Sequence, residues 1–110
     1  MYLNKISQKL DELGMSRKLK GYKFVRMSVS EVIRLDFSVE IECVYLSVAK
    51  TFCTNKQNVE RNIRYAIEKT WEKGNIENIF NCFGYTIDEN RGKPTNREFL
   101  FMIADKVMYL

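Results

Sequence analysis

Hydrophobic residues recur at helical spacing along residues 55–73, and this stretch is the most informative part of the chain. Thr54, followed three residues later by Gln57, matches a capping box, which predicts that a helix begins near Asn55. Gly74 predicts the end of this helix, because glycine readily takes the left-handed conformation that closes many helices. The stripe expected to be buried comprises Val59, Ile63, Ala66, Ile67, Thr70 and Trp71.

A second amphipathic helix is predicted immediately upstream, where apolar positions again follow a helical period. Its periodic positions are Val39, Ile41, Val44, Tyr45, Val48, Ala49 and Phe52. The short gap between the two helices makes residues 39–73 a candidate helix-turn-helix. In that motif the second helix lies in the major groove of DNA, and its N-terminal residues meet base edges.

The polar face of the predicted helix over residues 55–73 has side chains that suit base recognition. Arginine pairs with guanine, glutamine or asparagine pairs with adenine, and glutamate accepts a hydrogen bond from cytosine. The candidate base-reading residues are Gln57, Asn58, Glu60 and Arg61. The candidate phosphate-binding residues are Lys56, Arg64, Tyr65 and Lys69.

The same face also fits an ordinary solvated helix. Glu60, Arg64 and Glu68 are spaced four residues apart, a pattern typical of intrahelical ion pairs worth about 0.2–0.5 kcal/mol each. Residue types alone favour this interpretation slightly, because any surface helix can have such a face. Tyr65 likewise has two interpretations, since its hydroxyl could donate to a phosphate or its ring could lie along its own helix.

The remaining apolar stripes predict that the 110-residue chain forms one compact, all-α domain of about six helices. Two helices precede the motif, the first of them ended by Gly14. After the motif, a short helix ends at Gly84, and Thr95 with Glu98 matches a capping box that begins the last helix. Residues 88–94 are predicted to be a loop. The stripes of these four helices are Leu3, Ile6, Leu10 and Leu13; Tyr22, Val25, Val29, Val32 and Ile33; Ile76, Ile79, Phe80 and Phe83; and Phe99, Met102, Ile103 and Val107.

Charge gives weak support for a nucleic-acid partner. The chain has 18 basic and 14 acidic residues, a net charge of only +4. The first 26 residues are more basic, so this segment either lies along a phosphate backbone or keeps the domain soluble. Its acidic residues are Asp11 and Glu12, and its basic residues are Lys5, Lys9, Arg17, Lys18, Lys20, Lys23 and Arg26.

Missing residue types argue against an enzyme. The chain has no histidine, the commonest general base and metal ligand, and no glycine-rich phosphate-binding motif. Cys43, Cys53 and Cys82 are odd in number and widely spaced, which favours buried or free thiols over a zinc site or disulfides. We therefore expect no catalytic residue, metal or cofactor. With no apolar run long enough to cross a bilayer and no signal peptide, the expected location is the cytoplasm, at the nucleoid.

Short sequence motifs occur in a characteristic order along most of the chain, many of them outside the helix-turn-helix. They are Lys20-Gly21-Tyr22, Ala49 with Phe52, Val59-Glu60-Arg61, Ile63-Arg64, Ala66-Ile67-Glu68, Trp71, Gly74-Asn75-Ile76, Phe83-Gly84-Tyr85-Thr86, Lys93-Pro94-Thr95-Asn96, Glu98-Phe99 and Ala104-Asp105-Lys106. Through these segments, from about Leu13 to Lys106, the chain resembles the C-terminal DNA-binding domain of the stage-zero sporulation protein A family, response regulators that start endospore formation. A generic helix-turn-helix would not share the segments outside the motif.

This resemblance implies an all-helical transcription regulator that binds short operator boxes in tandem on double-stranded DNA. It implies that Glu60 and Arg61 contact base edges and that Arg64 holds a phosphate. It also implies a contact between the short helix and a sigma subunit of RNA polymerase. The candidate residues for that contact are Glu77, Asn78 and Asn81.

The chain departs from the family's pattern at four positions. Asn58 stands where arginine is usual, and its shorter, uncharged side chain is expected to change contacts at the edge of the operator. Tyr65 replaces a usual histidine, and Asn62 a usual alanine. Leu46 replaces a usual proline, which should affect the first helix of the motif rather than recognition.

Regulation and assembly are expected to differ from those of a two-domain regulator. The family's regulators have an N-terminal receiver domain, for which 110 residues leave no room, so we expect a separated effector domain or a product without its switch. Such a chain would bind DNA constitutively or compete with a full-length regulator. The alternative is a domain that serves chiefly as a protein-interaction module. We expect a monomer in free solution, because no long apolar seam remains after the core stripes are assigned.

Overall fold

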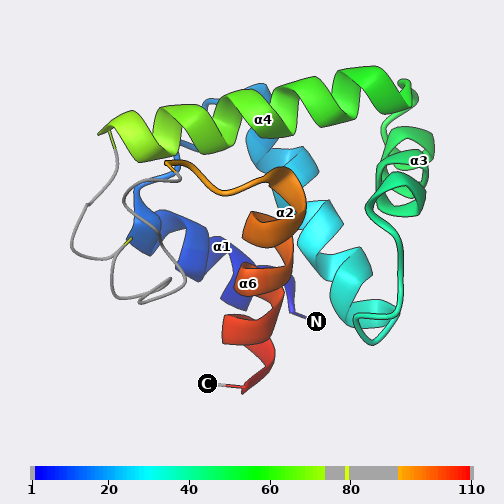
Figure 1. Ribbon diagram of the computed structural model, residues 1–110, viewed down its shortest axis with the longest axis horizontal. Coiled ribbons are helices and arrows are strands. Elements are labelled where there is room, and N and C mark those ends of the chain that lie inside the picture. Colours follow the sequence, from blue (N-terminus) through cyan, green and yellow to red (C-terminus); the bar gives the residue numbers. More distant parts are fainter. Residues whose placement is uncertain (1, 74–78, 80–91, 110) are drawn as a thin grey trace.

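The computed structural model describes residues 2–73, 79 and 92–109, and most of them belong to five α-helices (Figure 1). The helices are α1 (Leu3–Leu13), α2 (Lys20–Arg34), α3 (Ile41–Thr51), α4 (Lys56–Lys73) and α6 (Asn96–Tyr109). The described residues contain no strand, so the predicted all-α class is confirmed. Gly74 and the predicted short helix after it lie outside the described residues, except for Ile79, which is buried.

Helix α2 is the central element and packs against α1, α3, α4 and α6 (Figure 1). The apolar stripe of α2 is buried as predicted, because its neighbours cover that face and remove it from water. In α4 the predicted stripe is buried at Val59, Ile63, Ala66, Ile67 and Thr70. Trp71 is only partly buried, and its ring meets that of Phe99 edge-on with the ring centres 6.2 Å apart.

Three helices end in the same backbone arrangement. Near the ends of α1, α2 and α3, two consecutive amides donate to carbonyl groups three and five residues earlier, respectively. Phe37, which follows α2, is left-handed with φ of 64°. The first of the two amides belongs in each case to a left-handed residue, and these are Gly14, Asp36 and Cys53, with φ of 89°, 53° and 54°. Of these three residues, only Gly14 was predicted to end a helix, because the other two are not glycines. The arrangement at Cys53 forms the turn between α3 and α4.

Helix α4 begins one residue later than its predicted cap implied. Asn55 is the N-cap, since its side-chain Oδ1 accepts the backbone N–H of Asn58 at 2.8 Å. The predicted box of Thr54 with Gln57 is therefore wrong. Thr54 Oγ1 instead accepts a hydrogen bond from the side-chain amide of Asn58 at 3.0 Å.

The capping box predicted for the last helix is confirmed. The backbone N–H of Thr95 donates to Glu98 Oε1 at 2.9 Å, and the backbone N–H of Glu98 donates to Thr95 Oγ1 at 3.1 Å. Of the predicted loop before it, residues 92–94 are described and are not helical.

Helices α2 and α4 cross at Gly21, where a side chain would not fit. A Cβ atom at this position would lie 2.8 Å from the carbonyl carbon of Asn62, nearer still to its oxygen, and 2.9 Å from the Cβ of Ala66. Two of these atoms belong to the backbone of α4, which cannot shift alone. Gly21 therefore sets how closely α4 approaches the central helix.

Replacing Gly21 with alanine is expected to lower the free energy of unfolding by ~3 kcal/mol, because α4 must move away from α2 and disturb the core packing. Urea denaturation followed by circular dichroism measures this loss. Gly92→Ala is the control, since Gly92 has φ of 82° but no atom within 4 Å of an added Cβ. Its free energy of unfolding should fall only by the cost of placing alanine in the left-handed conformation, about 1–2 kcal/mol. Equal losses in both variants would contradict the packing role of Gly21.

Candidate nucleic-acid interface

Helices α3 and α4 lie where the helix-turn-helix was predicted, and residues 52–55 join them. In Figure 1, α4 runs along one edge of the molecule, with its buried face toward the other helices. Gln57, Glu60 and Arg61 are exposed, and Asn58 is half-buried. The four candidate base-reading residues therefore lie together in the first two turns of α4, with three of them open to solvent.

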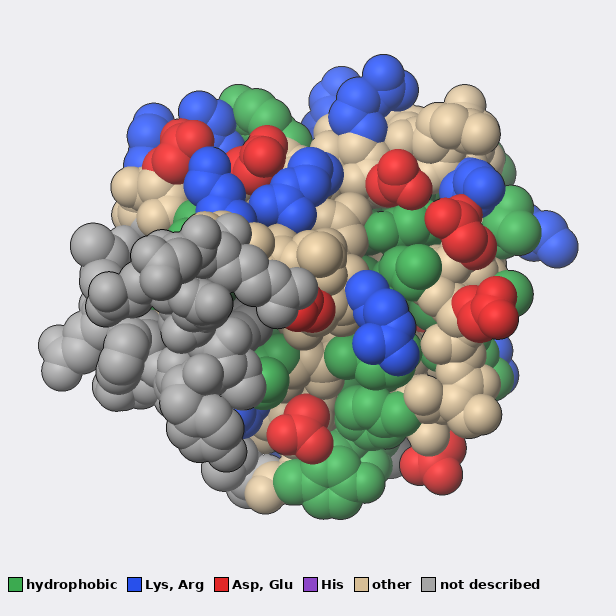
Figure 2. Space-filling view, viewed as in Figure 1, with side chains coloured by type: hydrophobic (Ala, Val, Ile, Leu, Met, Phe, Trp, Pro, Cys, Tyr) green, Lys and Arg blue, Asp and Glu red, His purple; other side chains and the backbone are tan. Residues whose placement is uncertain are grey.

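Basic side chains gather over α4. Figure 2 shows Lys and Arg side chains along the edge of the molecule where α4 runs, with a smaller number of acidic side chains among them. This mixture means that several of the cations already have a carboxylate nearby.

The predicted phosphate ligands Lys56 and Lys69 each have partners within the protein. Lys56 Nζ lies 2.8 Å from Glu42 Oε2 of α3, and the hydrogen bond that Lys56 donates to this carboxylate raises the pKa of Lys56. Lys69 Nζ lies 3.6 Å from Glu72 Oε2 and 5.4 Å from the centre of the Tyr65 ring. Tyr65 is 51% exposed, with this lysine of its own helix beside it. A phosphate would compete with a carboxylate for either lysine.

Arg64 ties α4 to the segment before α6. Its Nη1 donates to the carbonyl oxygen of Pro94 at 2.8 Å and lies 3.5 Å from Asn96 Oδ1. Its Nε lies 3.4 Å from Glu68 Oε2, one of the intrahelical ion pairs that the alternative interpretation of this face predicted. Arg64 therefore has a structural role that its helical position alone did not indicate.

A buried polar junction joins α3, α4 and α6 beside Arg64. Asn96 Nδ2 donates to the Tyr45 hydroxyl at 3.0 Å and to the backbone carbonyl of Glu60 at 3.3 Å. Tyr45 and Asn96 are both buried, and burial raises the pKa of the Tyr45 phenol. The junction thus holds the backbone of α4 at a candidate base-reading residue.

A groove above this junction extends the candidate interface to α6. Arg61, Tyr65 and Arg97 are among the residues that line it. Arg97 is exposed, and its guanidinium carbon lies 4.2 Å from the centre of the Phe101 ring. Arg97 could not be identified from the sequence, because only the folded chain brings the first turn of α6 beside α4.

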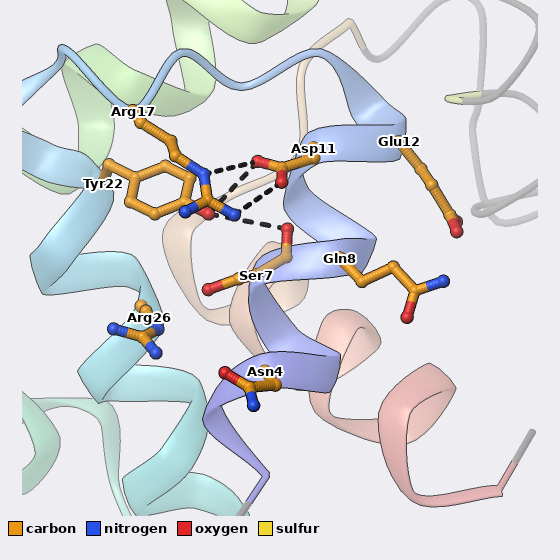
Figure 3. A pocket seen from close by; sticks show the side chains of 8 residues that line it. All are labelled: Asn4, Ser7, Gln8, Asp11, Glu12, Arg17, Tyr22 and Arg26. Carbon is orange, nitrogen blue, oxygen red and sulfur yellow. Dashed lines mark hydrogen bonds and ion pairs between the residues drawn. The ribbon is translucent and has the colours of Figure 1, made fainter.

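The basic N-terminal segment contains cations in two different settings. Arg17 binds Asp11 with a shortest distance of 2.7 Å and lowers the pKa of this carboxyl, and the Tyr22 hydroxyl also donates to Asp11 at 3.2 Å (Figure 3). These contacts fasten α1 to the start of α2. Lys23 instead lies beside the helix-turn-helix, with Nζ 5.1 Å from the centre of the Phe52 ring. Lys23 is therefore better placed than Arg17 to meet DNA.

The other candidate chemistry adds nothing to this interface. Cys43 and Cys53 are exposed free thiols, and Cys82 lies outside the described residues. In the described part of the chain, no cluster of His, Cys, Asp or Glu could hold a metal ion, and no helix is long and apolar enough to cross a membrane. The predicted polymerase contacts also lie outside that part: Glu77, Asn78 and Asn81.

Residues 6–107 match the model of the family described as sporulation initiation factor Spo0A, C terminal. The chain therefore belongs to this family. The match includes both helices of the helix-turn-helix and most of α6, so the predicted resemblance is confirmed. The Spo0A C-terminal family consists of DNA-binding effector domains of transcription regulators, and it is not a family of enzymes.

In this Spo0A C-terminal domain, Asn96→Ala is expected to lower the free energy of unfolding by about 1–3 kcal/mol, because Tyr45 and the Glu60 carbonyl lose their buried donor. Tyr45→Phe is the matched control. It removes one hydroxyl and leaves Asn96 bound to Glu60, so its loss should be about 0.5–1.5 kcal/mol. Urea denaturation of the two variants tests the junction, which would be refuted if Asn96→Ala were the milder change.

Proposed function

We propose that α4 is the recognition helix of a sequence-specific transcription regulator and lies in the major groove of its operator. The observation that supports this best is an exposed polar face on a helix fixed at two places. Gly21 brings α4 against α2, and Asn96 binds the α4 backbone at Glu60. Base edges are recognised at hydrogen-bond distance, so a helix that reads them must be held in one position.

Arg61 and Glu60 are the proposed central base-reading residues. Arg61 is exposed, and its planar guanidinium has two parallel N–H groups that match O6 and N7 of guanine. Glu60 is exposed beside it and can accept a hydrogen bond from cytosine N4. Gln57 and Asn58 lie in the turn before, so they would meet the neighbouring base pairs.

Phosphate contacts are proposed to flank these residues. The ligands proposed from α4 are Lys56, Arg64, Tyr65 and Lys69, and to these we add Lys23 and Arg97 from the neighbouring helices. Three of the α4 cations must share or exchange a carboxylate partner when they meet a phosphate. Their present partners are Glu42, Glu68 and Glu72, respectively for Lys56, Arg64 and Lys69. Each of these three therefore adds less to DNA affinity than a cation without a carboxylate nearby.

Arg61→Ala is expected to weaken binding to the preferred operator by ~1–3 kcal/mol and to relax the preference at one base pair, because a bidentate guanine contact is lost. Lys56→Ala is the comparison and should weaken binding to all duplexes alike. Fluorescence anisotropy with the family's operator box and a scrambled duplex measures both effects. Uniform weakening in both variants would mean that Arg61 only binds phosphate.

Glu42→Gln is expected to strengthen binding to every duplex, because it frees Lys56 and removes a negative charge near the DNA backbone. If Lys56 then gains a phosphate contact, the plot of log affinity against log salt should steepen by about 0.9. A salt series by anisotropy tests this, with Glu42→Gln/Lys56→Ala as the control that cannot gain the contact. An equal slope in Glu42→Gln and in Glu42→Gln/Lys56→Ala would remove Lys56 from the phosphate-binding set.

The second candidate role is that of a protein-interaction module that contacts a sigma subunit or competes with a full-length regulator. Retained sequence preference in Arg61→Ala, together with altered recruitment of polymerase, would favour this role over base recognition. The monomeric state and the tandem arrangement on DNA stay predictions, which analytical ultracentrifugation with and without operator DNA would check.

A further inference from the structure

Three side chains form a hydrogen-bonded row along the start of α4. Asn58 Nδ2 donates to Thr54 Oγ1 at 3.0 Å, and Asn58 Oδ1 accepts from Asn62 Nδ2 at 2.9 Å. Asn62 Nδ2 also donates to the backbone carbonyl oxygen of Asn58 at 2.8 Å. All three residues are half-buried, so the row is partly shielded from water.

This row determines which way the Asn58 amide points. The backbone carbonyl of Asn58 accepts only, so it requires the nitrogen of Asn62 rather than its oxygen. That nitrogen in turn requires the oxygen of the Asn58 side chain. A flipped Asn58 would place two N–H donors against each other. The nitrogen of Asn58 is therefore directed to Thr54 and its oxygen to Asn62.

The two partners leave part of the Asn58 amide unused. A primary amide has two N–H donors and two acceptor sites, and Thr54 and Asn62 occupy one of each. Because these partners lie one turn before and one turn after Asn58, they bind the two ends of the amide along the helix axis. One N–H donor and one acceptor site of the amide therefore remain for a further partner. Adenine presents the complementary pair, N7 and N6–H, in the major groove.

We propose that Asn62 is a positioning residue that orients Asn58 to bind an adenine, which makes the pair a determinant of operator specificity. The proposal rests on the proposed function, in which α4 lies in the major groove. Asn62 touches no base itself. Without Asn62, the Asn58 amide keeps only Thr54, whose hydroxyl both donates and accepts and therefore does not exclude the flipped state.

The test is selection from a duplex library randomised across the operator, applied to the wild-type chain and to Asn58→Ala, Asn62→Ala and the double variant. Asn58→Ala should reduce the preference for adenine at one base pair by about fivefold or more. Asn62→Ala should reduce the preference at the same base pair, and the double variant should lose no more than Asn58→Ala. Preferences at the other base pairs should stay unchanged. Asn4→Ala, an exposed helical position in α1, is the matched control.

A second measurement separates orientation from a structural effect. Replacing the selected adenine with 7-deazaadenine removes the N7 acceptor, so it should weaken the wild-type chain and leave Asn62→Ala much less affected. Thr54→Ala is a contrasting variant, because Asn62 still holds the oxygen of the Asn58 amide there, so Thr54→Ala should keep the adenine preference that Asn62→Ala loses. Circular dichroism confirms the fold of each variant.

The outcomes distinguish the inference from the function on which it rests. If the wild-type chain enriches no sequence, the proposed recognition by α4 fails. If it enriches an operator but Asn62→Ala keeps the adenine preference that Asn58→Ala loses, the positioning role is overturned. Uniform weakening of all sequences by Asn62→Ala would also overturn it.

Discussion

The close crossing of α2 and α4 at Gly21 is the contact on which the position of the recognition helix depends. Helix α2 packs against every other described helix, so whatever rests directly on it is fixed relative to the whole core. The absence of a side chain at Gly21 lets the backbone of α4 take that place. On another side of α4, Asn96 binds the Glu60 carbonyl and Arg64 binds the Pro94 carbonyl. The Gly21 contact is steric and limits the distance between α4 and α2. The hydrogen bonds of Asn96 and Arg64 are polar and limit the rotation of α4 about its axis.

The electrostatics of α4 favour discrimination over strong general attraction. Three of its five cations face carboxylates at 2.8 to 3.6 Å, in the pairs Lys56 with Glu42, Arg64 with Glu68, and Lys69 with Glu72. Non-specific affinity for DNA comes from phosphate neutralisation, and a cation with a carboxylate neighbour contributes less to it. Contacts to base edges then make up a larger share of the total binding energy. In the proposed function that share depends on Arg61 and Glu60, and both residues are exposed.

The parts of the fold that local sequence determines were predictable, and the parts that depend on distant segments were not. Helical periodicity identified the buried stripes, and the box of Thr95 with Glu98 identified the start of α6. The turn between α3 and α4 was predicted, but its left-handed residue Cys53 was not, because this conformation is unusual for a residue other than glycine. The candidate base-reading residues followed from their types and their face of the helix. The partner of Arg64 did not, since the carbonyl of Pro94 is brought to it only by tertiary packing.

Position 62 connects the helix crossing to the DNA-facing side chains. The carbonyl group of Asn62 lies against Gly21, while its side chain binds Asn58. The resemblance implies that both asparagines depart from the family's pattern, with arginine usual at position 58 and alanine at position 62. A long guanidinium can meet DNA without a neighbour to orient it, whereas a short amide has two similar ends and needs a partner to distinguish them. The amide at position 62 supplies that partner. Two departures that look independent in the sequence therefore form one hydrogen-bonded unit, on a helix whose place is set by a glycine forty residues away.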